Sequence, residues 1–232
     1  FMFKVTAYLA AASLSLAVLS APALAGDSNK KELTVYTYDS FVSDWGMGPL
    51  IKPTFEEQCG CTLNLVGMED AVAMLQRLKL EGASSKADLV LGLDLNLVDD
   101  AKKTGLFAGH TVDTSGLNMP IDWQDDAFVP FDYGYFAFVY NTETMPNPPK
   151  SLDELVNAGP ELKVIIQDPR SSTPGLGLML WMKSVYGDQS DAAWTKLSDN
   201  ILTTTKGWSE AYFSLFLADE APMVLSYSTS PA

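Results

Sequence analysis

Polar and aromatic side chains follow each of the first three β-prone stretches of the sequence, at the point where the stretch ends. Carboxyl ends of neighbouring parallel strands meet at one edge of a sheet, where open α/β folds bind their ligands. A carboxylate in front of a helix can also simply cap it, and capping is the simpler interpretation of Asp70 or Asp94 taken alone. Together the three strand ends indicate a ligand site, whose candidates are Tyr38, Asp39 and Trp45, then Glu69 and Asp70, then Asp94 and Asn96.

A cluster of hydroxyl side chains precedes the helix predicted over residues 174–186. Residues 167–175 read QDPRSSTPG, so that Ser172 and Thr173 stand directly before Pro174 at the first helical position. Proline is favoured there because the first N–H groups of a helix have no partner within it. Those N–H groups can bind an anion such as phosphate, although the hydroxyls can equally be ordinary caps. The segment is not a P-loop, because no Lys-Ser/Thr pair follows its glycines.

Aromatic residues near the end of the chain occupy positions that are not obvious core positions. Trp208 precedes a polar helix start, Tyr212 lies on the helix predicted there, and Tyr227 ends the last predicted strand. Trp and Tyr faces attract organic cations by roughly 0.5–2 kcal/mol each, depending on desolvation. Packing between two lobes is the structural alternative for these rings.

The sequence offers no recognisable set of catalytic or metal-ligating residues. The single histidine, His110, is predicted to be a solvated loop residue, so a His-based triad has no support. Cys59 and Cys61 are too few for a structural zinc site. In an oxidising compartment they can form a small disulfide, and otherwise they are buried free thiols. We therefore predict no catalytic residue, no metal site and no cofactor.

Strands and helices alternate along the chain, which is typical of βαβ units and a mostly parallel sheet. Strands are predicted at residues 33–38, 62–66, 87–91, 164–167 and 223–227, and helices at 50–58, 71–80, 95–103, 152–156, 174–186, 191–197 and 209–217. The stretch 127–141 is aromatic and β-prone but contains Pro130, which a central strand would not hold. We interpret it as the crossing from a first α/β lobe, residues 26–130, to a second, residues 131–232.

Residues 1–25 have the layout of a cleavable export signal. Lys4 is followed by an apolar run over residues 5–19, and Ala23-Leu24-Ala25 supplies small residues at the positions that a signal peptidase reads. A membrane-spanning helix needs about 20 predominantly apolar residues, and this run is shorter and interrupted by serines. We predict an exported chain without a stable membrane anchor. Its formal net charge of −14 argues against nucleic acid and anionic membranes as partners.

Several motifs together resemble the periplasmic thiamine-binding proteins of bacterial ABC importers, a family of type II solute-binding proteins. The resemblance extends from about Leu33 to Ala232 and includes TVYTYDSF, DWGMGP, MEDAVAMLQRL, KADLVLGLD, QDPRSSTPGLGL, TKGWSEAY and VLSYSTSPA. It implies a type II periplasmic-binding-protein fold, in which two α/β lobes with mixed, mostly parallel sheets close on the ligand. It also implies a periplasmic monomer without enzymatic activity. Such a monomer captures thiamine, and thiamine phosphates such as the pyrophosphate, for an inner-membrane ABC permease.

The same resemblance implies a role for seven residues. Aromatic faces suit the thiazolium cation of thiamine, a carboxylate suits an amine, and a helix start suits a phosphate. In chain order, the implied roles are the wall of the first lobe for Tyr38 and Trp45, the aminopyrimidine edge for Asp70, the phosphate end for Ser172 and Thr173, and the surface over the rings for Trp208 and Tyr227.

Two other classes of function stay open beside thiamine binding. One is an iron or polyamine binding protein of the same fold, since Tyr36 and Tyr38 with a carboxylate are similar to an iron site. The other is a thiaminase-like enzyme, which needs a reactive cysteine in the cleft. The resemblance further implies that the C-terminal part of the family, which returns to the first lobe, is missing from this sequence. We then expect residues 26–232 to bind thiamine less well than a longer chain.

Overall fold

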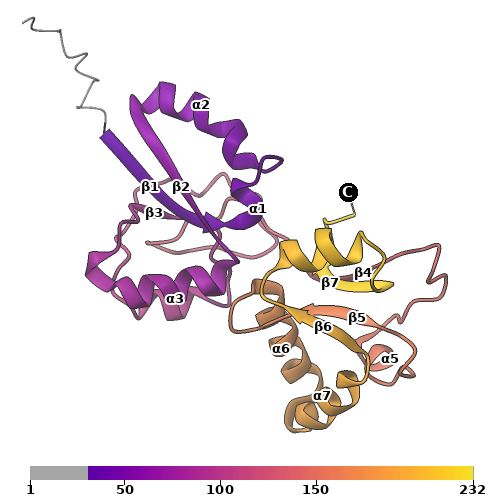
Figure 1. The fold of residues 1–232 in the computed structure, drawn as a ribbon. Coiled ribbons are helices and arrows are strands. Elements are labelled where there is room, and N and C mark those ends of the chain that lie inside the picture. Colours follow the sequence, from indigo (N-terminus) through magenta and orange to yellow (C-terminus); the bar gives the residue numbers. More distant parts are fainter. Residues whose placement is uncertain (1–30, 232) are drawn as a thin grey trace, which may run out of the picture. The chain divides into compact units, whose positions relative to one another are not determined.

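The computed structural model of the protein describes residues 31–231, so the predicted signal peptide, residues 1–25, lies outside the described residues. The first half of the described part folds around a three-stranded parallel sheet in the order β2-β1-β3 (Figure 1). Its strands are β1 (Lys31–Tyr38), β2 (Cys61–Met68) and β3 (Leu89–Val90), and its helices are α1 (Asp39–Val42), α2 (Met47–Cys59), α3 (Ala71–Glu81), the 3-10 turn η1 (Gly82–Ser84) and α4 (Val98–Lys102).

The apolar face of α3 and the sheet form the core of this half. Val72, Leu75 and Leu78 recur at helical spacing and are buried against Tyr36 of β1. In the register of the sheet, Tyr38 at the end of β1 pairs with Met68 at the end of β2. The residues that follow these two strands therefore start from the same edge of the sheet, as the sequence pattern predicts.

The second half folds around a mixed four-stranded sheet in the order β4-β7-β5-β6 (Figure 1). β4 runs antiparallel to β7, whereas β5 is parallel to both β6 and β7. The strands are β4 (Phe136–Tyr140), β5 (Val164–Gln167), β6 (Ile201–Thr205) and β7 (Met223–Tyr227), and the helices are α5 (Leu152–Val156), α6 (Thr173–Tyr186), the 3-10 turn η2 (Gly187–Gln189), α7 (Ser190–Ser198) and the π-helix η3 (Glu210–Phe216).

The core of the second half lies between this sheet and the helices α5, α6 and α7. Leu178 and Met182 of α6 and Leu197 of α7 are fully buried, and they pack in one cluster with Val164 of β5. Burial of each such side chain contributes about 1.5–3 kcal/mol to folding. This core fixes α6, and α6 in turn fixes the hydroxyl-bearing turn at its start.

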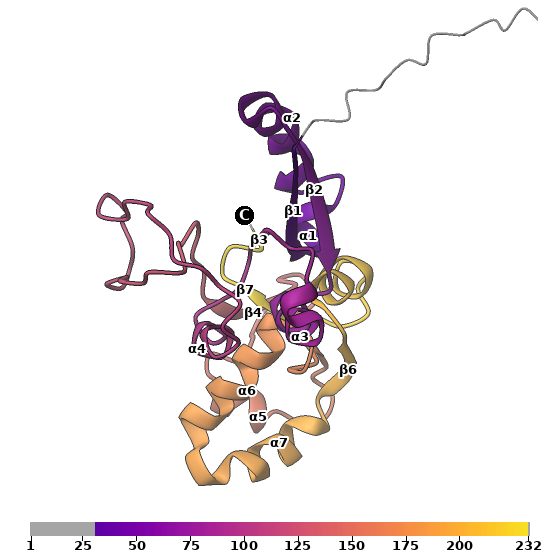
Figure 2. The same cartoon turned by 90° about the vertical axis from the view of Figure 1, so that its left-hand side faces the viewer.

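Several elements differ from the sequence-based expectation, the first of which is the unpredicted helix α1. The strand β6 was not predicted, and the stretch 87–91 contains only the two-residue strand β3. The segment 209–217 was predicted as an ordinary helix, but its regular part, η3, is a π-helix. Between α4 and β4, residues 103–135 contain no helix or strand (Figure 2), so the aromatic stretch 127–141 is a strand only over β4.

A disulfide joins Cys59 and Cys61 at the point where α2 ends and β2 begins. Gly60 between them lies in the left-handed region with φ of 61°, which suits a glycine because it has no Cβ. Among residues 31–231, no helix is both long and apolar enough to cross a membrane.

A candidate ligand-binding cavity

One cavity of about 1350 Å³ is lined by residues that follow strands of both sheets. Ligand pockets commonly measure about 300–1,000 Å³, so this space accommodates a small organic molecule. Five carboxylates and several aromatic rings line it, and no Lys or Arg of residues 31–231 does. The lining side chains used below are Tyr38, Asp70, Asp94, Asp132, Trp208 and Tyr227.

Asp70 is the most heavily hydrogen-bonded carboxylate of the cavity wall. Its Oδ1 accepts from the backbone N–H of Ala71 at 2.9 Å and from the hydroxyl of Thr173 at 2.9 Å. Its Oδ2 accepts from the hydroxyl of Ser172 at 2.9 Å and from the backbone N–H of Thr173 at 3.1 Å. Asp70 thus caps α3 and also binds the start of α6, two helix N-termini that both favour a negative charge.

The two hydroxyls that the resemblance assigns to phosphate are turned toward Asp70 in this structure. Ser172 has no exposed surface and does not line the cavity, whereas Thr173 is 5% exposed and does. A further backbone bond, from Ala73 N–H to the carbonyl of Ser171 at 3.1 Å, joins the same two turns. The structure therefore brings Asp70, Ser172 and Thr173 together, with the carboxylate as the anion at the helix start.

The start of α6 is close to β5 because of Gly175. A Cβ at this position would lie 2.5 Å from the backbone oxygen of Gln167, which real side chains do not tolerate. The absence of a side chain lets the helix approach the end of the strand, which positions Thr173 beside Asp70.

Negative charges surround two tyrosines in the cavity. Burial raises the pKa of Tyr38 to about 12, and the carboxylates of Asp132 and Asp70 add to that increase. Burial also raises the pKa of Tyr227, and Asp70, Asp94, Tyr38 and Asp132 add to that increase. Both phenols are neutral donors at physiological pH.

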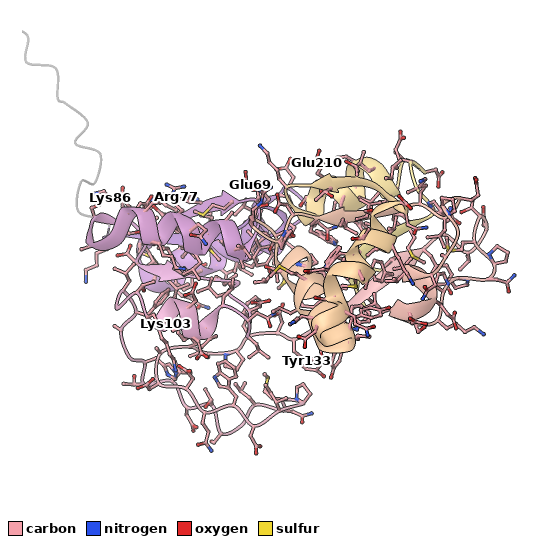
Figure 3. The ribbon with its side chains drawn as sticks, turned by 90° about the horizontal axis from the view of Figure 1, so that it is seen from below. Glu69, Arg77, Lys86, Lys103, Tyr133 and Glu210 are labelled. Carbon is pink, nitrogen blue, oxygen red and sulfur yellow. A yellow bond between two sulfur atoms is a disulfide. The ribbon has the colours of Figure 1, made fainter. Side chains whose placement is uncertain are left out.

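The carboxylates themselves are held in an environment that disfavours charge. Burial raises the pKa of Asp94 above its ordinary value of 3.8, and the charge of Asp70 adds to this increase. Burial likewise raises the pKa of Asp132. For Asp70 burial raises the pKa as well, and its hydrogen bonds from Ala71, Ser172 and Thr173 oppose that increase. In Figure 3, Arg77 and Lys86 lie far from Tyr133 of the cavity wall, and Lys86 does not itself line the cavity, although its neighbours Ser85 and Ala87 do.

The late aromatic residues form one cluster at the cavity. The rings of Trp208 and Tyr212 are stacked with centroids 5.1 Å apart, and Trp208 lies 6.4 Å from Tyr227. The indole N–H of Trp208 donates to the hydroxyl of Ser226 at 2.7 Å, which fixes the plane of the ring. Tyr227 in turn packs against Phe136 of β4, with centroids 5.5 Å apart. This is a rigid apolar surface that can receive the face of a planar cation.

Trp45 is not part of that surface. Its side chain is 58% exposed and packs against Phe213 of η3, with ring centroids 4.6 Å apart, and it does not line the cavity. Of the seven residues assigned by the resemblance, five line the cavity, namely Tyr38, Asp70, Thr173, Trp208 and Tyr227, and two do not, namely Trp45 and Ser172.

Asp132 and His110 are among the residues of the cavity wall that the sequence did not single out as site residues. Asp132 is the single carboxylate in the aromatic stretch FVPFDYGYF. Its position among aromatic residues is the feature of the sequence that could have indicated a binding residue. His110 was predicted to be solvated, but it is half-buried: its Nε2 donates to the carbonyl of Asp125 at 3.1 Å, and its Nδ1 accepts from the N–H of Val112 at 3.1 Å. Among residues 31–231 no group of three His, Cys, Asp or Glu side chains is placed to hold a metal ion.

Comparison with known proteins places the chain in a family. Residues 51–230 match the family of bacterial extracellular solute-binding proteins, and the chain belongs to this family. Its fold is the type II periplasmic-binding-protein fold, which the resemblance of the sequence motifs implied.

Individual relatives are close over the part that they share. The chain is 60% identical over 203 residues to a thiamine-binding periplasmic protein of Escherichia coli, covering 88% of this chain and 62% of that protein. A protein of the same name from Brucella abortus is 59% identical, with 88% and 60% covered. A solved structure, described as a periplasmic thiamin binding protein, is 59% identical with a TM-score of 0.85, covering 89% of this chain and 64% of that one. The chain thus spans less than two thirds of the length of these relatives.

Proposed function

We propose that this protein captures thiamine in the cavity for delivery to an ABC permease of the inner membrane. The observation that carries the proposal is the lining: five carboxylates and no Lys or Arg among the described residues, beside the ring cluster of Trp208 and Tyr227. Thiamine has a thiazolium cation and a planar aminopyrimidine, which fit a negative cavity with aromatic faces. The name of the relatives at 59–60% identity supports the same ligand.

The remaining roles follow from this function. The protein acts in the periplasm after removal of residues 1–25, as a monomeric carrier rather than an enzyme. Residues 26–130 and 131–232 form the two lobes, and their closure on the ligand is a population shift toward the closed state. Tyr38, Thr173, Trp208 and Tyr227 lie at the ligand in our proposal. We propose thiamine phosphates as ligands of the same cavity through their two rings, since no Lys or Arg of residues 31–231 lines it to pair with a phosphate.

Calorimetric titration tests the ligand, with thiamine, its monophosphate, its diphosphate, spermidine and ferric citrate as parallel samples. We expect saturable binding of thiamine. Binding of spermidine or iron in its absence would replace the proposal with the corresponding binding function. Consumption of thiamine during the titration would indicate an enzyme instead.

The variant Trp208→Ala tests the place of the ligand. Loss of the ring should weaken thiamine binding by about 1–3 kcal/mol, because stacking and burial of the cation are lost. Trp45→Ala removes the same side chain outside the cavity lining, so a smaller loss is expected. Equal affinities of Trp208→Ala and the unchanged protein would contradict a site on this ring cluster.

A further inference from the structure

Asp70 and Asp94 follow the neighbouring strands β2 and β3, and both line the cavity, but they differ in their free hydrogen-bonding capacity. An ionised carboxylate offers about four acceptor positions. Asp70 uses four of them, on Ala71, Ser172 and twice on Thr173. Asp70 can therefore contact a ligand donor only by giving up a bond that holds α3 or α6.

The carboxylate of Asp94 has unused positions for accepting hydrogen bonds. Its Oδ2 accepts one hydrogen bond, from the side-chain amide of Asn96 at 3.1 Å. Its Oδ1 is buried and has no hydrogen-bond partner among residues 31–231. The backbone N–H groups of Asn96 and Leu97 lie near enough to lower the pKa of Asp94, yet neither makes a hydrogen bond of proper geometry to Oδ1. A buried acceptor left without a donor costs about 1–3 kcal/mol. A ligand recovers that energy when the Asp94 side chain turns so that Oδ1 meets a ligand donor in the cavity.

The missing partner must carry an N–H or O–H group. The thiazolium nitrogen of thiamine has no hydrogen, so the cationic ring can be attracted to Asp94 but cannot satisfy Oδ1. The amino group on the pyrimidine ring of thiamine has two hydrogens and is the donor of matching chemistry.

We propose that Asp94 is the residue that recognises the pyrimidine amino group of the ligand, and that Asp70 positions the wall without contacting that amine. This inference rests on the proposed function, since it assigns a role within the thiamine site. Asp132 also accepts no hydrogen bond from the described residues, but its side chain is exposed. Water can therefore satisfy its oxygens in the empty cavity, and a ligand donor gains less there than at the buried Oδ1 of Asp94.

The experiment compares two ligands on matched variants of the chain. Thiamine is titrated beside oxythiamine, which has an oxo group in place of the amino group and retains the thiazolium cation. The unchanged chain should bind thiamine about 10-fold or more tightly than oxythiamine, because the oxo group meets the carboxylate with an acceptor. In Asp94→Asn the amide offers both a donor and an acceptor, and the ratio should fall to within about 3-fold.

Two further variants separate recognition from charge and from folding. Asp132→Asn should weaken both ligands by the same factor and keep their ratio, because it removes only a negative charge from the cavity. Asp191→Asn, at an exposed position in the first turn of α7, should change neither affinity nor ratio.

Failure of the role of Asp94 and failure of thiamine binding give different outcomes. An Asp94→Asn variant that loses both ligands equally, or keeps the ratio of the unchanged chain, overturns the role of Asp94 and leaves thiamine binding intact. Failure of the unchanged chain to bind thiamine overturns the proposed function and this inference with it.

Discussion

At the scale of single residues, the cavity keeps carboxylates where folding alone would not place them. Asp94 and Asp132 have a raised pKa because of burial, and the described residues provide no Lys or Arg within the lining to offset their charge. Such groups reduce the stability of the empty protein and favour a cationic ligand. We therefore expect these carboxylates to lower the stability of the empty protein and to strengthen binding of a cationic ligand.

The stability of Asp94→Asn tests the first of these effects. A raised folded-state pKa means that the folded protein binds a proton more readily than the unfolded chain, so the charge of Asp94 destabilises the fold at neutral pH. Removing it should raise the melting temperature of the empty protein at pH 7, by about 2–4 °C for each kcal/mol gained. The gain should shrink as pH falls through the raised pKa toward 3.8, because Asp94 becomes protonated first in the folded state and, below 3.8, in the unfolded chain as well.

Thermal melts between pH 4 and pH 8, with Asp191→Asn alongside, check this expectation. A variant that melts lower than the parent at pH 7 would mean that the bond to Asn96 outweighs the cost of the charge.

Residue identity alone left the role of Asp70 open between a cap and a ligand group. The structure shows a cap of α3, which the local sequence predicts. It also shows bonds to Ser172 and Thr173, about a hundred positions further along the chain. No local pattern contains that pairing, because it depends on how two sheets are placed. The position of Trp45 outside the cavity has the same origin.

At the scale of elements, prediction succeeded where a short apolar run ends at clear turn signals. The bounds of β5, β7 and α5 match the expected residues, since VIIQ, MVLSY and LDELV are each followed by breakers. β6 was not predicted from its residues, ILTTT, and its place in the sheet comes from pairing with β5. The cavity-lining stretch 103–135 has no periodicity from which its course could be deduced.

The approach of α6 to β5 leads to a prediction for Gly175→Ala. The added methyl group meets three backbone atoms of Gln167 and Asp168 within 2.8 Å, and backbone cannot move aside as a side chain can. We expect a net loss of about 1–3 kcal/mol in unfolding free energy, measured by urea denaturation.

Gly159→Ala is the matched control for that measurement. A Cβ at Gly159 has no atom within 4 Å, so the same substitution should change stability by less than about 0.5 kcal/mol. Equal effects at the two glycines would show that α6 does not depend on close contact with β5.

At the scale of the whole described molecule, the turn after β2 and the turn after β5 hold each other. Asp70 binds Ser172 and Thr173, Ala73 binds the carbonyl of Ser171, and Leu176 of α6 packs on the core of the first half. The contact between Trp45 and Phe213 adds a second link. These links make the two sheets fold and unfold as one cooperative unit in our interpretation, and Asp70 is their centre.

Asp70→Ala should uncouple the two halves. The change removes one acceptor from two helix starts and leaves two hydroxyls and two N–H groups without their partner, which costs about 2–4 kcal/mol in total. Because each sheet keeps its own core, the loss should appear in calorimetry as a broadened or split transition rather than as a simple shift. Asp191→Ala, which removes an exposed carboxylate at the start of α7, should keep a single sharp transition. A single sharp transition in Asp70→Ala as well would mean that packing of Leu176 and the ring contact of Trp45 suffice to couple the halves, and that Asp70 serves its own helix alone.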